Sequence, residues 1–188
     1  MANTINATSG VGIVSTADNT NELILQTNGT NAVSIDSSQN VSFAQTLALG
    51  VSNTLMELTL SAAAETVTIA ATAATGTVNF DVSTQSILYY TSNASANWTL
   101  NIRGSSSTTL NSIMATGQSV TVTHLVTQGG TAYYNSALTV DGTSVTPKWS
   151  GGTAPSAGNA NSVDVYTYTL IKTGSGSFTV FASQTRYA

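Results

Sequence analysis

The single histidine, His124, is the side chain best suited to acid–base chemistry or metal binding near neutral pH. It lies in the segment SVTVTHLVTQ and shares the strand parity of Val120, Val122 and Val126. One interpretation is a catalytic base, or an ion ligand where three copies of the chain meet on an axis. A triad also needs a positioned Ser and Asp, which a sequence alone does not reveal. We favour a histidine in the core or at an interface, hydrogen-bonded to a Thr or to the backbone. If His124 is functional, we expect it at the trimer axis or at an interface between subunits.

The carboxylates are isolated from one another along the chain. Glycosidases need two carboxylates in one cleft, and no spacing here indicates such a pair, so turn and solvent-facing roles are favoured. The segment KTGSG, which begins at Lys172, contains a β-lactamase tripeptide, but no S-x-x-K partner occurs, so it indicates a turn. We expect no enzyme activity, no cofactor and no metal. The acidic residues are Asp18, Glu22, Asp36, Glu57, Glu65, Asp81, Asp141 and Asp164.

Aromatic side chains provide a second type of candidate site, because their flat apolar rings can stack on sugars. Core or subunit-contact roles are favoured for the group as a whole. In each Tyr-Tyr pair the rings point to opposite sides of a strand, so one of them is expected in the core. Contacts to a partner or a host glycan are expected at Trp149, Tyr133 and Tyr134, and Trp149 is the best surface candidate because it lies in a Gly/Pro-rich loop.

The composition points to an uncharged, hydroxyl-rich surface. Charged residues make up 6% of the 188 residues, whereas ordinary soluble domains contain roughly 25%. The net charge is −4, and the four basic residues are spread along the chain. Phosphate backbones are bound by clustered Lys and Arg, so the sequence argues against nucleic-acid binding.

The chain has no cysteine, which excludes disulfides and thiolate metal sites. An exposed protein without disulfides commonly gains stability by oligomerisation. The start, MANTINATSG, has neither the basic nor the apolar region of a signal peptide, and no run of about 20 apolar residues predicts a membrane span. A phage virion component fits this combination, since it is made in the host cytoplasm and released by lysis.

The C-terminal stretch, residues 162–188, predicts a long β-hairpin around Gly174-Ser175-Gly176. Its first run places Asp164, Tyr166, Tyr168, Leu170 and Lys172 on one face and β-branched residues on the other. Its second run separates Phe178, Val180 and Ala182 from Thr179 and Phe181. Large apolar groups on both faces predict a hairpin in the middle of a two-layer β structure.

Earlier parts of the chain predict an arm and a short meander. Residues 1–21 are rich in Asn, Thr, Ser and Gly, which predicts an extended arm. Asn28-Gly29 and the cluster 37–40 predict turns between strands at 23–27, 32–35 and 41–47. Three such strands bury too little surface alone and need partner copies.

The remaining segments alternate between β-branched runs and turn residues at the spacing of sandwiches and barrels. In the Ala-rich part we favour strands at 55–60 and 66–71, with a helical turn at 61–65 as the alternative. Residues 147–161 hold both prolines and predict the longest irregular loop. Further strands are predicted at 77–82, 86–91, 98–102, 119–127 and 132–140, with a hairpin at Asp141-Gly142 reaching Val145.

The segment LILQTNGTNAVSIDSSQNVSFAQTL, residues 23–47, resembles the repeated short-strand units of tail fibres and related virion proteins of tailed bacteriophages, especially marine ones. The later part, with its Ser/Thr-rich strands and the segment WTLNIRG, resembles phage structural proteins. The resemblance implies a non-enzymatic, homotrimeric virion protein. Its partners would be copies of itself and a major capsid or tail protein, with no membrane insertion.

Together these observations predict an all-β protein with three parts. These are an extended arm over 1–21, a fibre-like meander over 22–53 and a jelly-roll-like β-sandwich over 54–188. The expected function is a capsid decoration, head-fibre or short fibre protein on the virion surface. The alternatives are a receptor-binding tip that recognises host glycans and, from a different class, a hydrolase using His124 at a trimer interface.

Overall fold

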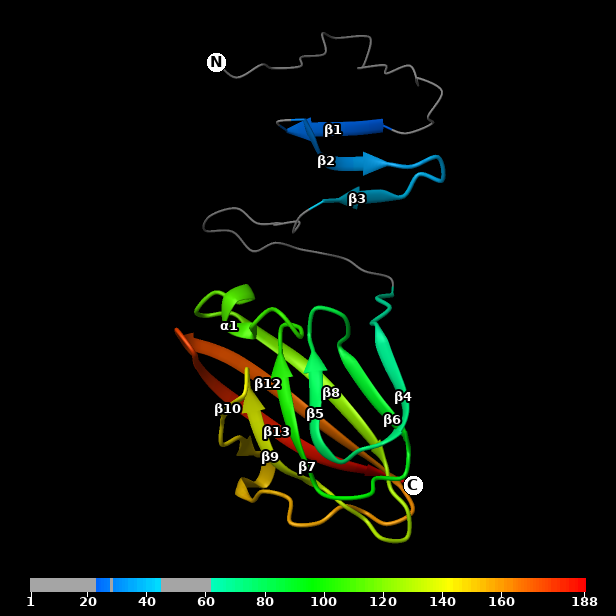
Figure 1. Ribbon diagram of the computed structural model, residues 1–188, viewed down its shortest axis with the longest axis vertical. Coiled ribbons are helices and arrows are strands. Elements are labelled where there is room, and N and C mark those ends of the chain that lie inside the picture. The colour runs from blue at the N-terminus through cyan, green and yellow to red at the C-terminus, as the bar shows by residue number, and fades with distance from the viewer. Residues whose placement is uncertain (1–22, 28, 45–61) are drawn as a thin grey trace. The chain divides into compact units, whose positions relative to one another are not determined.

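The computed structural model describes residues 23–27, 29–44 and 62–188. The chain forms two compact units, Met1–Ser61 and Ala62–Ala188, and each is described by itself (Figure 1). The expected arm over 1–21, the expected strand at 55–60 and the boundary near residue 53 lie outside the described residues.

The first unit contains a three-stranded antiparallel sheet in the order β1-β2-β3. Its strands are β1 (Leu23–Thr27), β2 (Thr30–Ile35) and β3 (Val41–Phe43). Gly29 turns the first hairpin with a φ of 74°. In the second turn, Asp36 Oδ1 accepts hydrogen bonds from the backbone N–H groups of Ser38 and Asn40. The predicted meander is confirmed over these residues, although β3 ends at Phe43 and residues 45–61 are not described.

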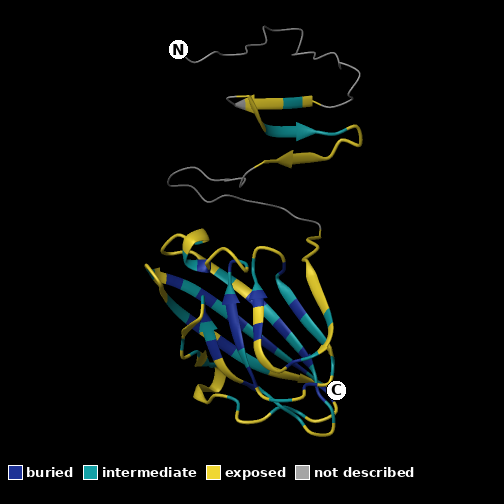
Figure 2. Ribbon diagram, in the orientation of Figure 1, coloured by how far each residue is buried: buried dark blue, intermediate teal, exposed yellow. Residues whose placement is uncertain are grey.

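Six apolar side chains of this meander share one face. The strand register pairs Leu23 with Ile35 and Ile35 with Val41, and it pairs Leu25 with Val33 and Val33 with Phe43. Leu25 is 56% exposed and Phe43 is 44% exposed. Figure 2 shows β1 and β3 mainly in the colour of exposed residues. The meander therefore presents an apolar strip of six side chains that its own three strands do not cover.

The second unit consists of two sheets around one core. The four-stranded sheet has the order β10-β9-β7-β5, and the six-stranded sheet has the order β11-β13-β12-β8-β6-β4. Single helical turns occur at α1 (Leu110–Ile113) and at η1 (Ser150–Gly152). The strands are β4 (Val67–Ala73), β5 (Gly76–Asp81), β6 (Ile87–Ser92), β7 (Trp98–Arg103), β8 (Ser119–Thr127), β9 (Asn135–Val140), β10 (Thr143–Ser144), β11 (Lys148–Trp149), β12 (Val163–Gly174) and β13 (Ser177–Tyr187).

From β4 to β9 the chain alternates between the two sheets, so neighbouring strands in each sheet run parallel. In the six-stranded sheet β4, β6 and β8 are parallel, and in the other sheet β5, β7 and β9 are parallel. The all-β, two-layer prediction is confirmed. The jelly-roll prediction is not confirmed, because a jelly roll is built from antiparallel Greek keys. Turn residues in the sequence predict where the chain reverses, but they do not predict which sheet the next strand enters.

The long hairpin β12–β13 adds antiparallel to β8 and has the predicted facing. The five alternate residues from Asp164 to Lys172, which the sequence placed on one face of β12, are all buried, so the turn or solvent-facing role expected for Asp164 was wrong. Gly176 makes the turn with a φ of 65°. Val180 and Ala182 are buried on β13, whereas Phe181 between them is exposed. Strand alternation therefore predicted which residues share a face, and the structure shows which of the two faces lies in the core.

The core lies between the sheets, where Figure 2 shows buried residues on both layers. Trp98, Leu100 and Ile102 share the buried face of β7. The strand prediction at 66–71 is confirmed by β4, and residues 62–65 are not helical. The prediction of one irregular loop over 147–161 was wrong in part, since β11 and η1 lie within it. Among the described residues, no helix is long and apolar enough to cross a membrane.

Candidate functional site

His124 lies in the core of its own subunit, on β8, with no exposed surface. The rings of Tyr90 and Trp98 contact it edge-on at centroid distances of 5.6 and 5.8 Å. Neither imidazole nitrogen has a hydrogen-bond partner among the described residues. Burial lowers the pKa of His124 to about 3, so the ring is neutral near pH 7.

This placement corrects two expectations about His124. The imidazole is not at a surface where three copies could share an ion, and the expected hydrogen bond to a Thr or to the backbone is not formed. A general base must also reach the proton that it abstracts. His124 is enclosed by aromatic side chains and is not positioned for that role.

The buried ends of β12 are occupied by polar groups that fix loops. At one end, Asp164 accepts hydrogen bonds from Gln128 Nε2 at 3.1 Å and from the backbone N–H and Nδ2 of Asn159 at 3.0 and 2.6 Å. At the other end, Lys172 Nζ donates to the carbonyls of Asn111 and Met114 at 2.5 and 2.8 Å. Both charged groups are engaged with the chain itself, which indicates structural roles.

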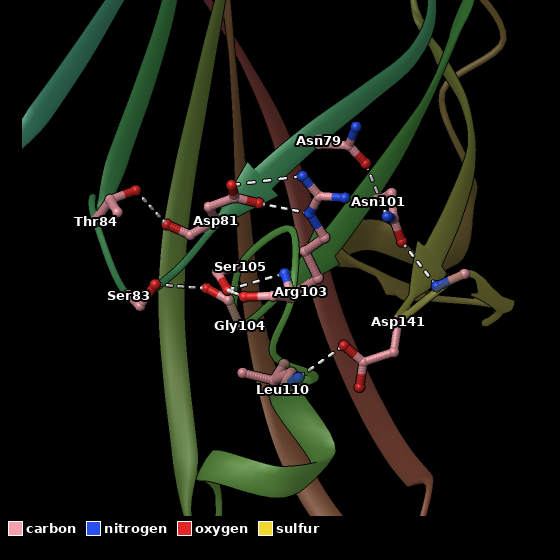
Figure 3. Close-up of polar contacts among 12 residues, drawn as sticks. Asn79, Asp81, Ser83, Thr84, Asn101, Arg103, Gly104, Ser105, Leu110 and Asp141 are labelled. Atoms are coloured by element: carbon pink, nitrogen blue, oxygen red, sulfur yellow. Dashed lines mark hydrogen bonds and ion pairs between the residues drawn. The ribbon is translucent and has the colours of Figure 1, made fainter.

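The four-stranded sheet carries a polar ladder on its outer side (Figure 3). Parallel register places Asp81 beside Arg103, with Oδ1 and Nε 2.6 Å apart, and Asn79 beside Asn101, which donates to it at 2.9 Å. Asn101 Oδ1 in turn accepts from Thr139 Oγ1 and from the backbone N–H of Gly142.

Asp141 extends this polar region to the start of α1, where its carboxylate accepts from the N–H groups of Leu110 and Asn111 at 2.7 and 2.9 Å. A hollow of about 330 Å³ beside the ladder is lined by Arg103, Asp141 and the hydroxyl-rich loop 105–109. The main donors and acceptors bond to one another, so the ladder ties the ends of β5, β7 and β9 together. The sequence signal for it was the recurrence of polar residues on the outward parity of these strands.

The three aromatic candidates do not share one groove. Trp149 is half-buried on β11, with its ring edge-on to Tyr168 at 6.0 Å. It lines a groove of about 440 Å³ with Lys148, Phe181 and other residues, but Tyr133 and Tyr134 do not line this groove.

Tyr133 and Tyr134 are tied to other loops. The backbone of Tyr133 bonds to the side chain of Gln128, and the backbone N–H of Tyr134 donates to Asn97 Oδ1. Phe181, which was not a candidate site residue from the sequence, also lines the groove at Trp149. Its place on the face opposite Val180 and Ala182 indicated an outward ring. Lys148 Nζ lies 5.7 Å from the centre of that ring.

The outer face of the six-stranded sheet is uncharged across five strands. The register aligns Ile87 with Thr123, Tyr89 with Leu125, and Leu125 with Val165. Ile69 on β4 is 68% exposed and Tyr187 on β13 is 60% exposed. Every outward position on β4, β6, β8, β12 and β13 is apolar, Tyr, Thr or Ser, and Lys148 joins this face only from the short edge strand β11.

A shallow groove of about 550 Å³ crosses this outer face. It is lined by Val67, Ile87, Tyr89, Thr123, Leu125, Val163, Val165 and Tyr187. These side chains offer mainly apolar surface and two phenol rings. The groove is therefore suited to another apolar surface rather than to a charged or highly polar ligand.

Comparison of the chain with protein-family models, with curated proteins and with solved structures gives no match. Within residues 23–27, 29–44 and 62–188, no three His, Asp or Glu side chains converge as metal ligands. The features that bear on function are the apolar strip of the meander, the uncharged outer face of the six-stranded sheet and the resemblance of residues 23–47.

Proposed function

We propose that this chain is a non-enzymatic structural protein of a bacteriophage virion. It acts as a homotrimer and serves as a capsid decoration, head-fibre or short fibre protein. The observation that carries this proposal is the uncovered apolar strip of the β1–β3 meander, which includes Leu25, Val33 and Phe43. A three-stranded sheet of this size needs a packing partner to be stable.

Identical copies provide that partner without charge repulsion. The strip is made of Leu, Ile, Val and Phe side chains, and the acidic Asp36 lies in the turn between β2 and β3. Three meanders packed about a common axis bury their strips against one another, and this contact would be one of those that hold the trimer together. The segment that carries the strip is also the one that resembles phage fibre units.

The sandwich serves as the projecting body in this proposal. Its polar groups stabilise loops and strand ends, as at Asp164, Lys172 and the Asn79–Asn101 pair. Its hydroxyl-rich, charge-poor surface is consistent with a particle exposed outside cells after lysis. Attachment to a major capsid or tail protein would place it on the virion surface, after synthesis in the host cytoplasm.

Light scattering of the purified chain tests the trimer. The expected mass is three times the 19.2 kDa of one chain, and a folded single chain at every concentration would contradict the proposal. Gold-labelled antibodies on phage particles then locate the protein. Labels repeated over the head support decoration, whereas labels at one vertex support a short fibre.

A glycan-binding tip is the second candidate, and the groove at Trp149 and Phe181 is the observation that favours it. A half-buried indole beside an exposed phenyl ring offers an apolar platform for a sugar. Binding on a glycan array that disappears in Trp149→Ala would support this role. Silence across the array, with tight binding to empty capsids, would favour decoration.

A further inference from the structure

We propose that the sandwiches of the homotrimer contact one another through the outer face of the six-stranded sheet. The inference rests on the proposed function, because it names the surface that a second copy covers. The centre of this surface is the cross-strand pair Leu125 and Val165, and the groove lined by Tyr89 and Tyr187 lies over it. In the trimer, this surface is covered by the same face of the neighbouring copies.

The distribution of charge selects this face over the outer face of the other sheet. The four-stranded sheet displays Asp81, Arg103 and the Asn79–Asn101 ladder on its outer side. Packing that side against identical copies would desolvate an ion pair and place equal charges near one another. The uncharged face of the six-stranded sheet has no ion pair to desolvate and no like charges to bring together. Identical copies can therefore pack against this face in several orientations.

The size of the face matches what an assembly interface requires. Five strands at about 4.8 Å spacing span roughly 24 Å, and the nine residues of β8 extend roughly 30 Å along them. The face therefore offers on the order of 700 Å² to its partners. Stable interfaces bury about 800 Å² on each partner. In a trimer, each face would divide this area between its two neighbours, roughly 350 Å² for each contact, so the face would add to the area that the meander strip buries.

The side chains on the face are of the kind that forms the inner layer between packed sheets. Val, Ile, Leu, Thr and Tyr side chains interdigitate when two sheets stack about 10 Å apart. Tyr89 and Tyr187 add large rings, and tyrosine is enriched where interfaces are fully desolvated. The mainly apolar residues that line the groove form an exposed patch, and exposed apolar patches on soluble proteins mark interaction surfaces.

The first test introduces a charge at the centre of the face. Leu125→Lys places an ammonium group where neighbouring copies are expected to exclude water. Thr99→Lys is the matched control, because Thr99 is an equally half-buried, outward-facing residue on β7, a central strand of the other sheet. Light scattering should give three chain masses for the wild type and for Thr99→Lys, and one chain mass for Leu125→Lys. Far-UV circular dichroism checks that both variants are folded.

A second test needs no disruptive charge. The chain has no cysteine, so a single cysteine reports local accessibility. In the wild-type background, Leu125→Cys should react with a maleimide at least ten times more slowly than Thr99→Cys. Dilution or mild denaturant that separates the subunits should remove the difference.

The outcomes separate this inference from the proposed function. If the wild type is trimeric, and if Leu125→Lys stays trimeric or Leu125→Cys reacts as fast as the control, the face is not the contact and the inference fails, while the trimer stands. If the wild type is a single chain, the proposed function fails and the inference fails with it. Three chain masses together with both Leu125 effects support the two proposals.

Discussion

His124 on β8 and Tyr166 on β12 are direct cross-strand partners, and their rings lie 6.4 Å apart inside the sandwich. The pair belongs to an aromatic cluster in which Trp98 stands edge-on to both rings. An imidazole in such surroundings is stable only as the neutral ring, because the imidazolium would be buried without an acceptor. Several consequences of this core and its edges can be measured.

The free energy of unfolding should fall at pH values below 6.5 because of His124. Its folded-state pKa is lowered to about 3 from the ordinary value of 6.5, so the unfolded chain takes up a proton first as the pH falls. The contribution of the neutral His124 ring to the free energy of unfolding is fully present above pH 6.5 and is lost as the pH falls from 6.5 to 3. The slope through most of that window is roughly 1.4 kcal/mol per pH unit.

Denaturant unfolding at pH 7 and pH 5 measures this loss, and His124→Phe is the control because it retains an aromatic ring that cannot titrate. The carboxylates are the same in both proteins. The difference between wild type and His124→Phe in how the free energy of unfolding changes with pH therefore reports the imidazole alone. The wild type should lose stability relative to His124→Phe on going to pH 5. Parallel losses would contradict the assignment.

Removing the carboxylate of Asp164 should be strongly destabilising. Asp164→Ala leaves the buried donors of Gln128 and Asn159 without their acceptor, at an expected cost of about 3 kcal/mol. Asp81→Ala removes a carboxylate from a partly exposed ion pair and should cost less than about 1 kcal/mol. Urea unfolding of both variants gives the comparison, and equal losses would argue against a structural role for Asp164.

Gly158 should tolerate no side chain. A Cβ there would lie 2.1 Å from the carbonyl oxygen of Tyr133, so Gly158→Ala must displace the backbone of one loop. We expect a loss of roughly 2–4 kcal/mol, in the range of overpacked core sites. Gly130→Ala is the matched control, since its nearest neighbour would lie 4.0 Å away. A melting temperature for Gly158→Ala as high as that of Gly130→Ala would contradict the close packing.

The apolar strip of the meander should contribute to assembly. Phe43→Ser removes an exposed ring from the strip, whereas Ser42→Ala changes the opposite face of the same strand. Because dissociation depends on concentration, Phe43→Ser should lower the melting temperature most at low protein concentration. Thermal scans over a hundredfold concentration range measure this effect. A loss that does not depend on concentration would place the role of Phe43 within one chain.

The sequence predicted the facing of strands better than their connectivity. Alternation separated the two faces of β12 correctly, but it did not show which face lies in the core, and the turn or solvent-facing role expected for Asp164 was wrong. Alternation depends only on the two-residue repeat of a strand, which the sequence displays directly. The assignment of each strand to one of two sheets depends on long-range packing, so the parallel pairings were missed.

The candidate sites were less accessible to sequence reasoning. His124 was correctly assigned to an apolar parity, but its aromatic neighbours come from β6, β7 and β12, and no local pattern indicates them. The short helix α1 depends on Thr109 and Asp141, which lie far apart in the chain. The uncharged outer face was visible only once the register had aligned five strands.

Because the chain alternates between the two sheets, the sandwich can gain or lose strands in both sheets at once. A pass of the chain consists of one strand in each sheet, such as β4 followed by β5. Duplicating or deleting a pass would widen or narrow both sheets by one strand and leave the two-layer packing intact. The β12–β13 hairpin ends this growth, because β12 occupies the free edge of β8 with an antiparallel strand. Extension by whole passes is therefore confined to the segment before β8.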